Sequence, residues 1–265
     1  MSVRYAPRTA APAAGPSMRL LLTEPARGLA ELAALPLAAP FLSLAPRGDG
    51  HGVLVLPGLL ASDNSTALLR SFLRMLGYQV RGWNLGRNVG PTDDVLDALP
   101  ARLDALTSQA GGPVSVIGWS LGGIYARELA RQRPALVRQV ITLGSPFALT
   151  DAGRSHADRA YQRRASLHAT GRVPSRAEIG RPIAVPSTAV YSRRDGIVAW
   201  QACIEAPTVL HGNVEVRCAH LGFGVDPATL WLIADRLAQA AGQQQPFRPP
   251  AALRSLYPVR SAPEE

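Results

Sequence analysis

The stretch at residues 113–132 reads PVSVIGWSLGGIYARELARQ. It opens with a short run rich in β-branched side chains, which is typical of a buried strand. It closes with apolar residues at helical spacing, and three glycines lie at the junction. A strand that passes through a tight turn directly into a helix is typical of a parallel α/β sheet.

The junction contains the pattern G-x-S-x-G, with Gly118, Ser120 and Gly122 at the defined positions. Between a strand and a helix, this pattern predicts a nucleophile elbow. Such a turn holds the serine in a strained backbone conformation, and the flanking glycines avoid clashes between neighbouring Cβ atoms. The alternative is a serine that merely begins a helix. We predict that Ser120 is a nucleophile.

Strand-like and helix-like segments alternate from about residue 52 to residue 241. This order predicts an α/β fold with a mostly parallel central sheet and helices on both faces. The carboxyl ends of parallel strands meet at one edge, where open α/β sheets place their sites. The expected strands lie at residues 52–58, 78–83, 113–120, 137–146, 187–192 and 213–220.

A serine hydroxyl needs a base, and His220 is the histidine that follows a predicted strand at its carboxyl end. Asp195 lies on the loop after the preceding strand, where a carboxylate can hold the histidine tautomer. The chain order Ser, Asp, His agrees with this assignment. Asp226 is the rival acid, but its position favours the N-cap of the last helix. We therefore predict the triad Ser120, Asp195 and His220.

An acyl-transfer site also needs two backbone N–H groups that stabilise the oxyanion. One is expected from Leu121, directly after the nucleophile, and the other from Leu59, on the loop after the first strand. Gly58 would let that loop approach closely. The apolar residues expected to line an acyl pocket are Trp119, Leu60, Phe147 and Phe223. The alternative is that some of them are part of the hydrophobic core.

Several segments carry a family resemblance: LPGLLAS at 56–62, GWSLGG at 118–123, LGSPF at 143–147, SRRDGIV at 192–198 and AHLGFG at 219–224. Over about residues 50–241 the chain resembles the α/β-hydrolase superfamily, and within it the bacterial lipases and esterases. The resemblance implies that the superfamily's first two strands are missing here. One departure is Pro57-Gly58, where such lipases usually have His-Gly. We expect no cofactor and no metal.

Four segments are expected: a disordered stretch at 1–16, a helical segment at 17–50 packed on the domain, a catalytic domain at 51–241 and a loose tail at 242–265. The domain carries an arginine-rich lid insertion at about 147–182. This insertion is either a solvated polar cover or a surface that faces anions. No signal peptide or transmembrane helix is expected, and the localisation is expected to be cytoplasmic. Peripheral membrane contact through the N-terminal segment stays open.

The net charge of +9 does not indicate a nucleic-acid-binding protein. All 28 basic residues are arginine, they are spread along most of the chain, and no recognition module is present. The two cysteines, Cys203 and Cys218, are either reduced thiols or one disulfide, since sequence gives no Cα separation. The oligomeric state is not predicted.

Three functions are compatible with these residues. The leading interpretation is an esterase or lipase that cleaves small-molecule or lipid esters through an acyl-serine. An acyltransferase or thioesterase acting on carrier- or CoA-bound acyl groups could use the same triad. The third is a catalytically silent scaffold used for binding, against which the intact set of three residues argues.

Overall fold

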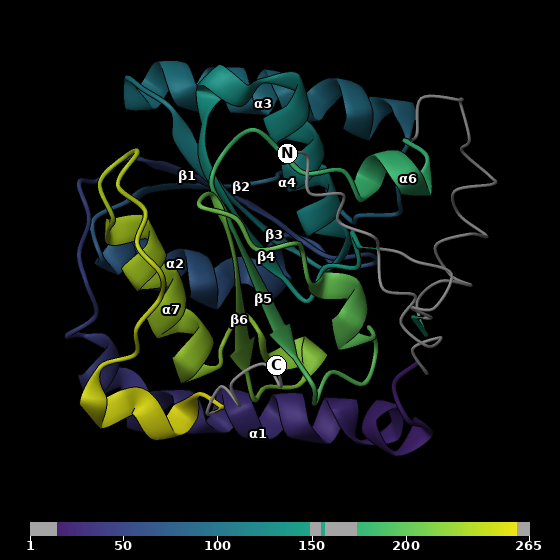
Figure 1. The fold of residues 1–265 in the computed structure, drawn as a ribbon, viewed down its shortest axis with the longest axis vertical. Helices are drawn as coiled ribbons and strands as arrows, with labels where there is room; N and C mark the ends of the chain where they lie inside the picture. The colour runs from purple at the N-terminus through teal and green to yellow at the C-terminus, as the bar shows by residue number, and fades with distance from the viewer. Residues whose placement is uncertain (1–14, 149–154, 157–173, 259–265) are drawn as a thin grey trace, which may run out of the picture.

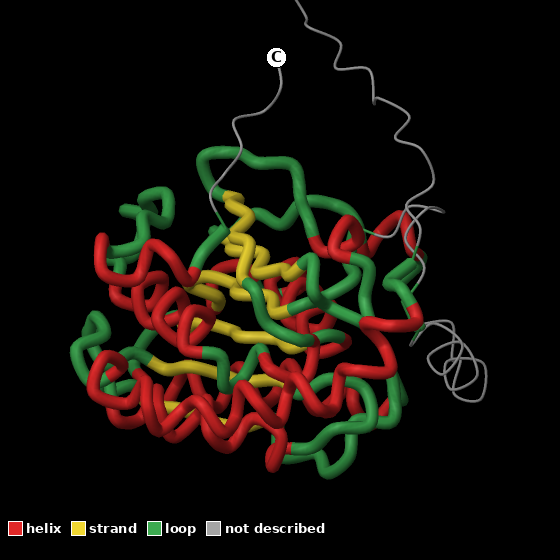
Figure 2. Tube along the Cα trace, turned by 90° about the horizontal axis from the view of Figure 1, so that it is seen from below, coloured by secondary structure: helices red, strands yellow, loops and turns green. Residues whose placement is uncertain are grey.

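The computed structural model describes residues 15–148, 155–156 and 174–258. Most of the predicted lid insertion at 147–182 lies outside these residues, as does most of the segment expected to be disordered at 1–16. The described part forms one layered α/β arrangement, with strands running through the middle of the molecule between helices (Figures 1 and 2).

The central sheet has six strands in the order β2-β1-β3-β4-β5-β6, and every neighbouring pair is parallel. The fold class predicted from the sequence is confirmed. The order reverses between β1 and β3, so the carboxyl ends of these strands flank the crevice where open α/β sheets bind ligands. The strands are β1 (Gly52–Leu56), β2 (Gln79–Gly82), β3 (Val114–Trp119), β4 (Val137–Leu143), β5 (Ser187–Ser192) and β6 (His211–Val216).

Helices cover both faces of the sheet, and each face has its own apolar core. The α3 and α4 helices pack on one face, and α2 and α7 pack on the other (Figure 1). β1, β3 and β4 are buried along almost their whole length because helices cover both faces, and their sequences are accordingly mostly apolar. The helices are α2 (Ala67–Met75), α3 (Asp93–Ala110), α4 (Leu121–Gln132), the short α6 (Arg176–Ile179) and α7 (Pro227–Ala238).

The N-terminal segment forms one long helix, α1 (Met18–Leu42). Ser17 caps it by accepting a hydrogen bond from the Leu20 N–H at 3.3 Å, and the helix continues through three prolines. In Figure 1 it runs along the lower edge of the molecule, beneath β5 and β6. Within the described residues, no helix is both long enough and apolar enough to span a bilayer.

The expectation of a loose tail is wrong for residues 251–257. Ala251–Leu256 form the 3₁₀ helix η5, and Leu253 and Tyr257 are buried in the core formed with α7. The Tyr257 hydroxyl donates a hydrogen bond to the Ala228 carbonyl at 2.7 Å. Burial of these two apolar side chains stabilises the packing of the segment on the domain. The Gln- and Pro-rich sequence around them did not indicate this packing.

Candidate active site

Ser120 stands in a strained backbone conformation at the end of β3. Its φ of 53° and ψ of −119° lie outside the regions that L-residues ordinarily occupy. Its N–H donates to the Leu143 carbonyl at 2.8 Å, and its own carbonyl accepts from Gly123 at 3.0 Å. The turn therefore has the geometry of a nucleophile elbow between β3 and α4.

Three glycines make the elbow sterically possible. A Cβ at Gly118 would lie 2.3 Å from the Gly122 carbonyl oxygen, and a Cβ at Gly122 would lie 2.4 Å from the Leu56 carbonyl oxygen. A Cβ at Gly123 would lie 2.0 Å from the Ser145 hydroxyl. These distances are too short for any side chain, so α4 can approach β1, β3 and the segment after β4 this closely only with glycine at these positions.

The loop after β1 lies directly against the elbow. A Cβ at Gly58 would be 3.2 Å from the Ser120 Cβ, as expected for a close approach. Leu60 has a φ of 65° and donates its N–H to the Asn88 carbonyl at 2.7 Å. Because that N–H is already used, the Leu59 N–H stays the better candidate for the oxyanion donor on this loop.

Asp195 and His220 form a buried hydrogen-bonded pair. The histidine Nδ1 lies 2.6 Å from the aspartate Oδ2, and the two side chains are almost fully buried. The other oxygen, Oδ1, accepts from the N–H groups of Ile197 at 2.8 Å and Val198 at 2.7 Å. The carboxylate is therefore held by its own loop while it accepts from Nδ1, the arrangement that directs the imidazole proton to Nδ1 and leaves Nε2 as the unprotonated ring nitrogen.

The pKa of His220 is raised above its ordinary value of 6.5. Burial alone would lower it, since burial disfavours the charged imidazolium. The negative charge of Asp195, its hydrogen bond and the charge of Glu24 together outweigh the effect of burial. The site is thus arranged to stabilise a proton on this imidazole.

Two further contacts bring the Asp195–His220 pair to the elbow. The Trp119 indole N–H donates to the His220 carbonyl at 3.1 Å, so the residue before Ser120 is tied to the histidine loop. Gly144 follows Leu143, the partner of Ser120, and a Cβ there would lie 3.1 Å from both His220 Nδ1 and Asp195 Oδ2. The structure therefore gathers the predicted nucleophile, base and acid at one edge of the sheet.

Glu24 of α1 is a site residue that the sequence analysis missed. Its side chain is 2% exposed, and it accepts hydrogen bonds from three backbone N–H groups. These are Gly196 at 2.6 Å, His220 at 3.1 Å and Leu221 at 3.2 Å. Arg27 pairs with the same carboxylate at 2.9 Å. One carboxylate thus joins the loop of the predicted acid to the loop of the predicted base.

Glu31 lies two turns further along α1 and supports the same region. Its Oε1 accepts from the Ala219 N–H at 2.8 Å, while its Oε2 is buried without a hydrogen-bond partner among the described residues. Burial, which disfavours the charged carboxylate, raises the pKa of Glu31 to about 7. The seven-residue spacing of Glu24 and Glu31 within an apolar helix was the signal in the sequence that could have revealed both.

The predicted pocket residues divide into two groups. Trp119 is partly buried beside the elbow, and Leu60 is exposed. Phe147 and Phe223 are fully buried, so their assignment to the pocket lining is not supported. The Phe223 ring packs edge-on against His220, and the Phe147 ring lies under the Arg127 guanidinium at 4.0 Å. Both aromatic side chains belong to the core that supports the site.

The remaining candidates have structural roles. Asp226 caps α7 by accepting from the Thr229 N–H at 2.8 Å, as its position predicted. Cys203 and Cys218 are free and buried, so the disulfide alternative is wrong for this structure. Within the described ranges, no group of three or more histidine, cysteine or acidic side chains could hold a metal ion.

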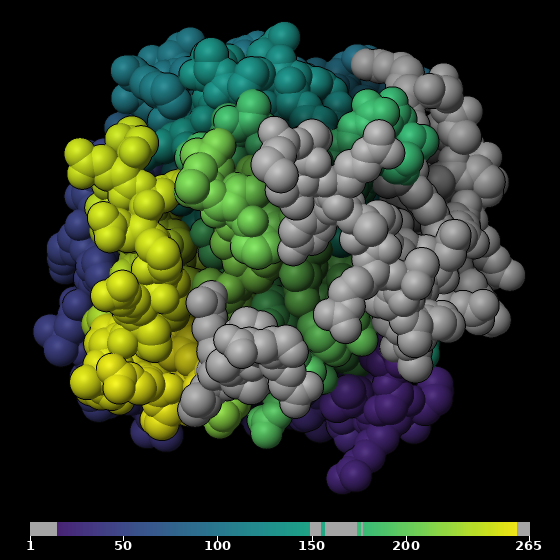
Figure 3. Space-filling view, viewed as in Figure 1, coloured from purple at the N-terminus to yellow at the C-terminus, as the bar shows by residue number. Residues whose placement is uncertain are grey.

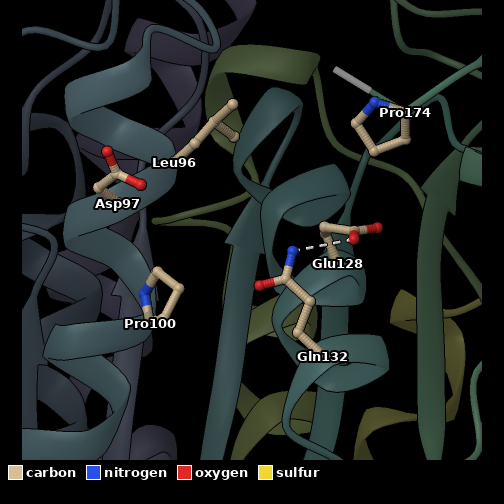
Figure 4. Close-up of a pocket in the computed structure, with 6 residues that line it drawn as sticks. All are labelled: Leu96, Asp97, Pro100, Glu128, Gln132 and Pro174. Carbon is tan, nitrogen blue, oxygen red and sulfur yellow. Dashed lines mark hydrogen bonds between the residues drawn. The ribbon is translucent and has the colours of Figure 1, made fainter. Parts of the chain in front are cut away.

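A cavity of about 300 Å³ between α3 and α4 is unrelated to these residues (Figure 4). Leu96 and Pro100 line one side, and Gln132 donates to Glu128 at 3.0 Å on the other. Its described lining contains no serine, threonine, cysteine or histidine. The candidate site is therefore defined by the strand ends and not by this cavity.

Solved structures of hydrolases resemble this chain at low sequence identity. Lipase B from Aspergillus fumigatus matches with a TM-score of 0.52 and 16% identity, over 74% of this chain. One of the metagenome-derived lipolytic enzymes LipS and LipT matches with a TM-score of 0.51 and 16% identity, over 72% of this chain and 93% of its own. The chain spans 55% of the length of the Aspergillus lipase.

No protein-family model matches the sequence, and no curated protein matches it. The sheet order, the elbow and the structural matches nevertheless agree with one another. The chain has the α/β-hydrolase fold.

Proposed function

We propose that this protein is a serine hydrolase that cleaves carboxylic esters. The observation that carries the proposal is the Asp195–His220 hydrogen bond of 2.6 Å, tied through Trp119 to the elbow that holds Ser120. A buried carboxylate that orients a histidine beside a strained serine is the arrangement that activates a hydroxyl for acyl transfer.

In the proposed reaction the Ser120 Oγ attacks the ester carbonyl carbon while His220 Nε2 takes the hydroxyl proton. The N–H groups of Leu121 and Leu59 stabilise the negative oxygen of the tetrahedral intermediate, each contributing about 3–4 kcal/mol. Collapse breaks the bond to the alcohol, which leaves with the proton from His220. Water then attacks the acyl-serine by the same steps, giving the acid and the free enzyme.

The N–H of Leu121 is well suited to the role of first donor. It is the first residue of α4, where the backbone N–H groups have no partner within the helix and the helix dipole favours negative charge. Two observations support Leu59 as the second donor: Gly58 lies close to Ser120, and the Leu60 N–H already donates to the Asn88 carbonyl.

The test is hydrolysis of p-nitrophenyl esters from acetate to palmitate by the wild type and by Ser120→Ala. We expect turnover by the wild type and a loss on the order of 10⁶ in kcat for the variant. The chain-length profile then distinguishes a short-chain esterase from a lipase. Equal turnover by the two proteins would exclude Ser120 as the nucleophile.

A fluorophosphonate probe separates the alternatives if no ester is cleaved. Labelling of the wild type without ester turnover would favour a thioesterase or acyltransferase that uses the same triad. Absence of labelling in a folded protein would instead favour the catalytically silent scaffold, since the probe requires only an activated serine.

A further inference from the structure

The α1 helix has an unusual distribution of side chains. Its carboxylates, Glu24 and Glu31, point into the protein, where they hold the loops of the candidate site. Among its exposed residues, only Arg19 and Thr23 are polar, and all the others are Leu, Ala, Pro, Met or Phe. A helix on a protein surface ordinarily has the opposite arrangement.

The outward leucines are strongly exposed: Leu37 at 80%, Leu22 at 75% and Leu29 at 65%. Figure 3 shows the first turns of α1, in purple, protruding at the lower right edge of the molecule. We call the following set the α1 face: Met18, Leu22, Leu29, Leu32, Leu37, Phe41 and Leu44, with the neighbouring Leu221 and Leu256.

The α1 face holds nine of the fourteen large exposed apolar residues in the described part of the chain. It extends over about 37 Å of helix, since α1 has 25 residues. A groove of about 510 Å³ continues it between α1, α7 and η5, lined by Leu37, Phe41, Trp231 and Leu256 among others. A concentrated apolar surface of this size indicates a binding surface.

The charges around the α1 face are mostly positive. Arg19, Arg194 and Arg217 are exposed around it, and Arg217 lines the groove itself. The Arg194 carbonyl accepts a hydrogen bond from the Arg27 side chain of α1 at 2.7 Å, which places that loop against the helix.

Asp226 also lines the groove, but this carboxylate is used as the cap of α7. Apolar side chains bordered by arginines complement a lipid surface that carries negative charge.

We propose that the α1 face binds the protein to an anionic lipid surface, with α1 lying in the plane of the interface. A second copy of this chain fits less well, because a symmetric pairing of two such faces would bring arginines against arginines on proteins of net charge +9. Lipid headgroups supply the negative charge that a second copy lacks at this surface.

Binding in this orientation has a consequence for the candidate site. Leu221 directly follows His220 and belongs to the α1 face, so the histidine loop would lie next to the lipid. This consequence depends on the proposed function, whereas the binding itself does not, and the two can be tested apart.

The experiment is sedimentation with vesicles made of equal parts phosphatidylcholine and phosphatidylglycerol, and with vesicles of phosphatidylcholine alone. The test variant is Leu29→Gln with Leu37→Gln. The matched control is Val209→Gln with Leu210→Gln, a pair of exposed apolar residues before the start of β6. All three proteins carry Ser120→Ala in a parallel set, so that binding is measured without catalysis.

We expect wild-type and control proteins to bind the anionic vesicles, with weaker binding to phosphatidylcholine and at high salt. The α1 variant should bind at least about tenfold more weakly, because two leucines no longer enter the interface. Its melting temperature should match that of the wild type, since both residues are exposed.

Equal binding by the α1 variant and the wild type would overturn the proposal, as would failure of the wild type to bind anionic vesicles. A concentration-dependent dimer in analytical ultracentrifugation that is abolished by the α1 variant, without vesicle binding, would assign the face to a second copy instead.

Discussion

The Glu24 carboxylate accepts a 2.6 Å hydrogen bond from the Gly196 N–H, although 172 residues separate the two in the sequence. The same oxygen accepts from the His220 N–H at 3.1 Å. A helix outside the α/β domain thereby fixes the relative position of the two loops that carry Asp195 and His220. This arrangement gives Glu24 an effect on the candidate site that can be measured.

Glu24→Gln should shift the acid limb of the kcat/KM profile to lower pH. Neutral His220 is the proposed base, so wild-type activity should rise with pH through a pKa above 6.5. Removing the negative charge of Glu24 removes one cause of that elevation, and the pKa should fall. Asp104→Asn, a change at an exposed carboxylate of α3, is the control and should leave the profile unchanged.

Glu24→Ala should be more damaging than Glu24→Gln. It leaves three backbone N–H groups near the site without their acceptor, and each buried unsatisfied donor costs about 1–3 kcal/mol. We expect lower stability in urea unfolding and lower kcat. A merely space-filling role for this side chain would instead give both variants the pH profile of the wild type.

Asp195→Ala should lower mainly the activity, whereas Asp226→Ala should lower mainly the stability. Asp195 contacts the imidazole, so its loss should lower kcat by about 10⁴ with little change in the overall fold. Asp226 caps α7, so its loss should reduce stability by about 1 kcal/mol and leave most of the activity. Ester hydrolysis and urea unfolding of both variants check this. Greater loss of activity in Asp226→Ala would reverse the assignment of the acid.

Gly144→Ala should lower kcat while the protein stays folded. The added Cβ would lie 2.5 Å from the Phe223 ring and 3.1 Å from both atoms of the Asp195–His220 hydrogen bond. Displacing the imidazole by a fraction of an ångström should cost about 10–100-fold. Gly86→Ala is the matched control, because Gly86 also has a positive φ but an added Cβ there would meet no atom of the described residues within 4 Å. Equal loss in both variants would indicate backbone strain alone.

Glu31→Gln should stabilise the protein at alkaline pH. The folded-state pKa is about 7 against an ordinary value of 4.5, so the folded protein keeps a proton that the unfolded chain releases in this window. Stability from this group therefore falls as pH rises from about 4.5 to about 7. The half-buried position limits the expected gain at pH 8.5 to about 1 kcal/mol. Urea unfolding at pH 5 should show no gain.

The sequence was sufficient to predict the elements that obey local rules. The strand–glycine–helix pattern around Ser120 predicted the elbow, and the positions of Asp195 and His220 after successive strands predicted their meeting at one edge. Asp226 was recognised as a cap because capping depends on a residue's immediate neighbours. Each of these predictions used interactions within a few residues or the general geometry of a parallel sheet.

Contacts between distant segments could not be predicted in this way. Glu24 meets His220 across 196 residues, and no local pattern specifies which loop a helix will touch. The same limitation explains Phe147 and Phe223, because an aromatic residue near a site motif can line a pocket or support it from below. Packing of Tyr257 against Ala228 is a third example, since an aromatic residue in a polar tail gives no indication of its partner.

The two native thiols, Cys203 and Cys218, are completely enclosed, and burial raises the pKa of each well above its ordinary value. Alkylating reagents require an accessible thiolate, so the folded protein should be inert toward maleimides. A cysteine introduced at an exposed position would then be the sole reactive thiol, because Cys203 and Cys218 are the only cysteines in the sequence. The protein therefore accepts a fluorophore or spin label at one chosen position without any prior removal of its own cysteines.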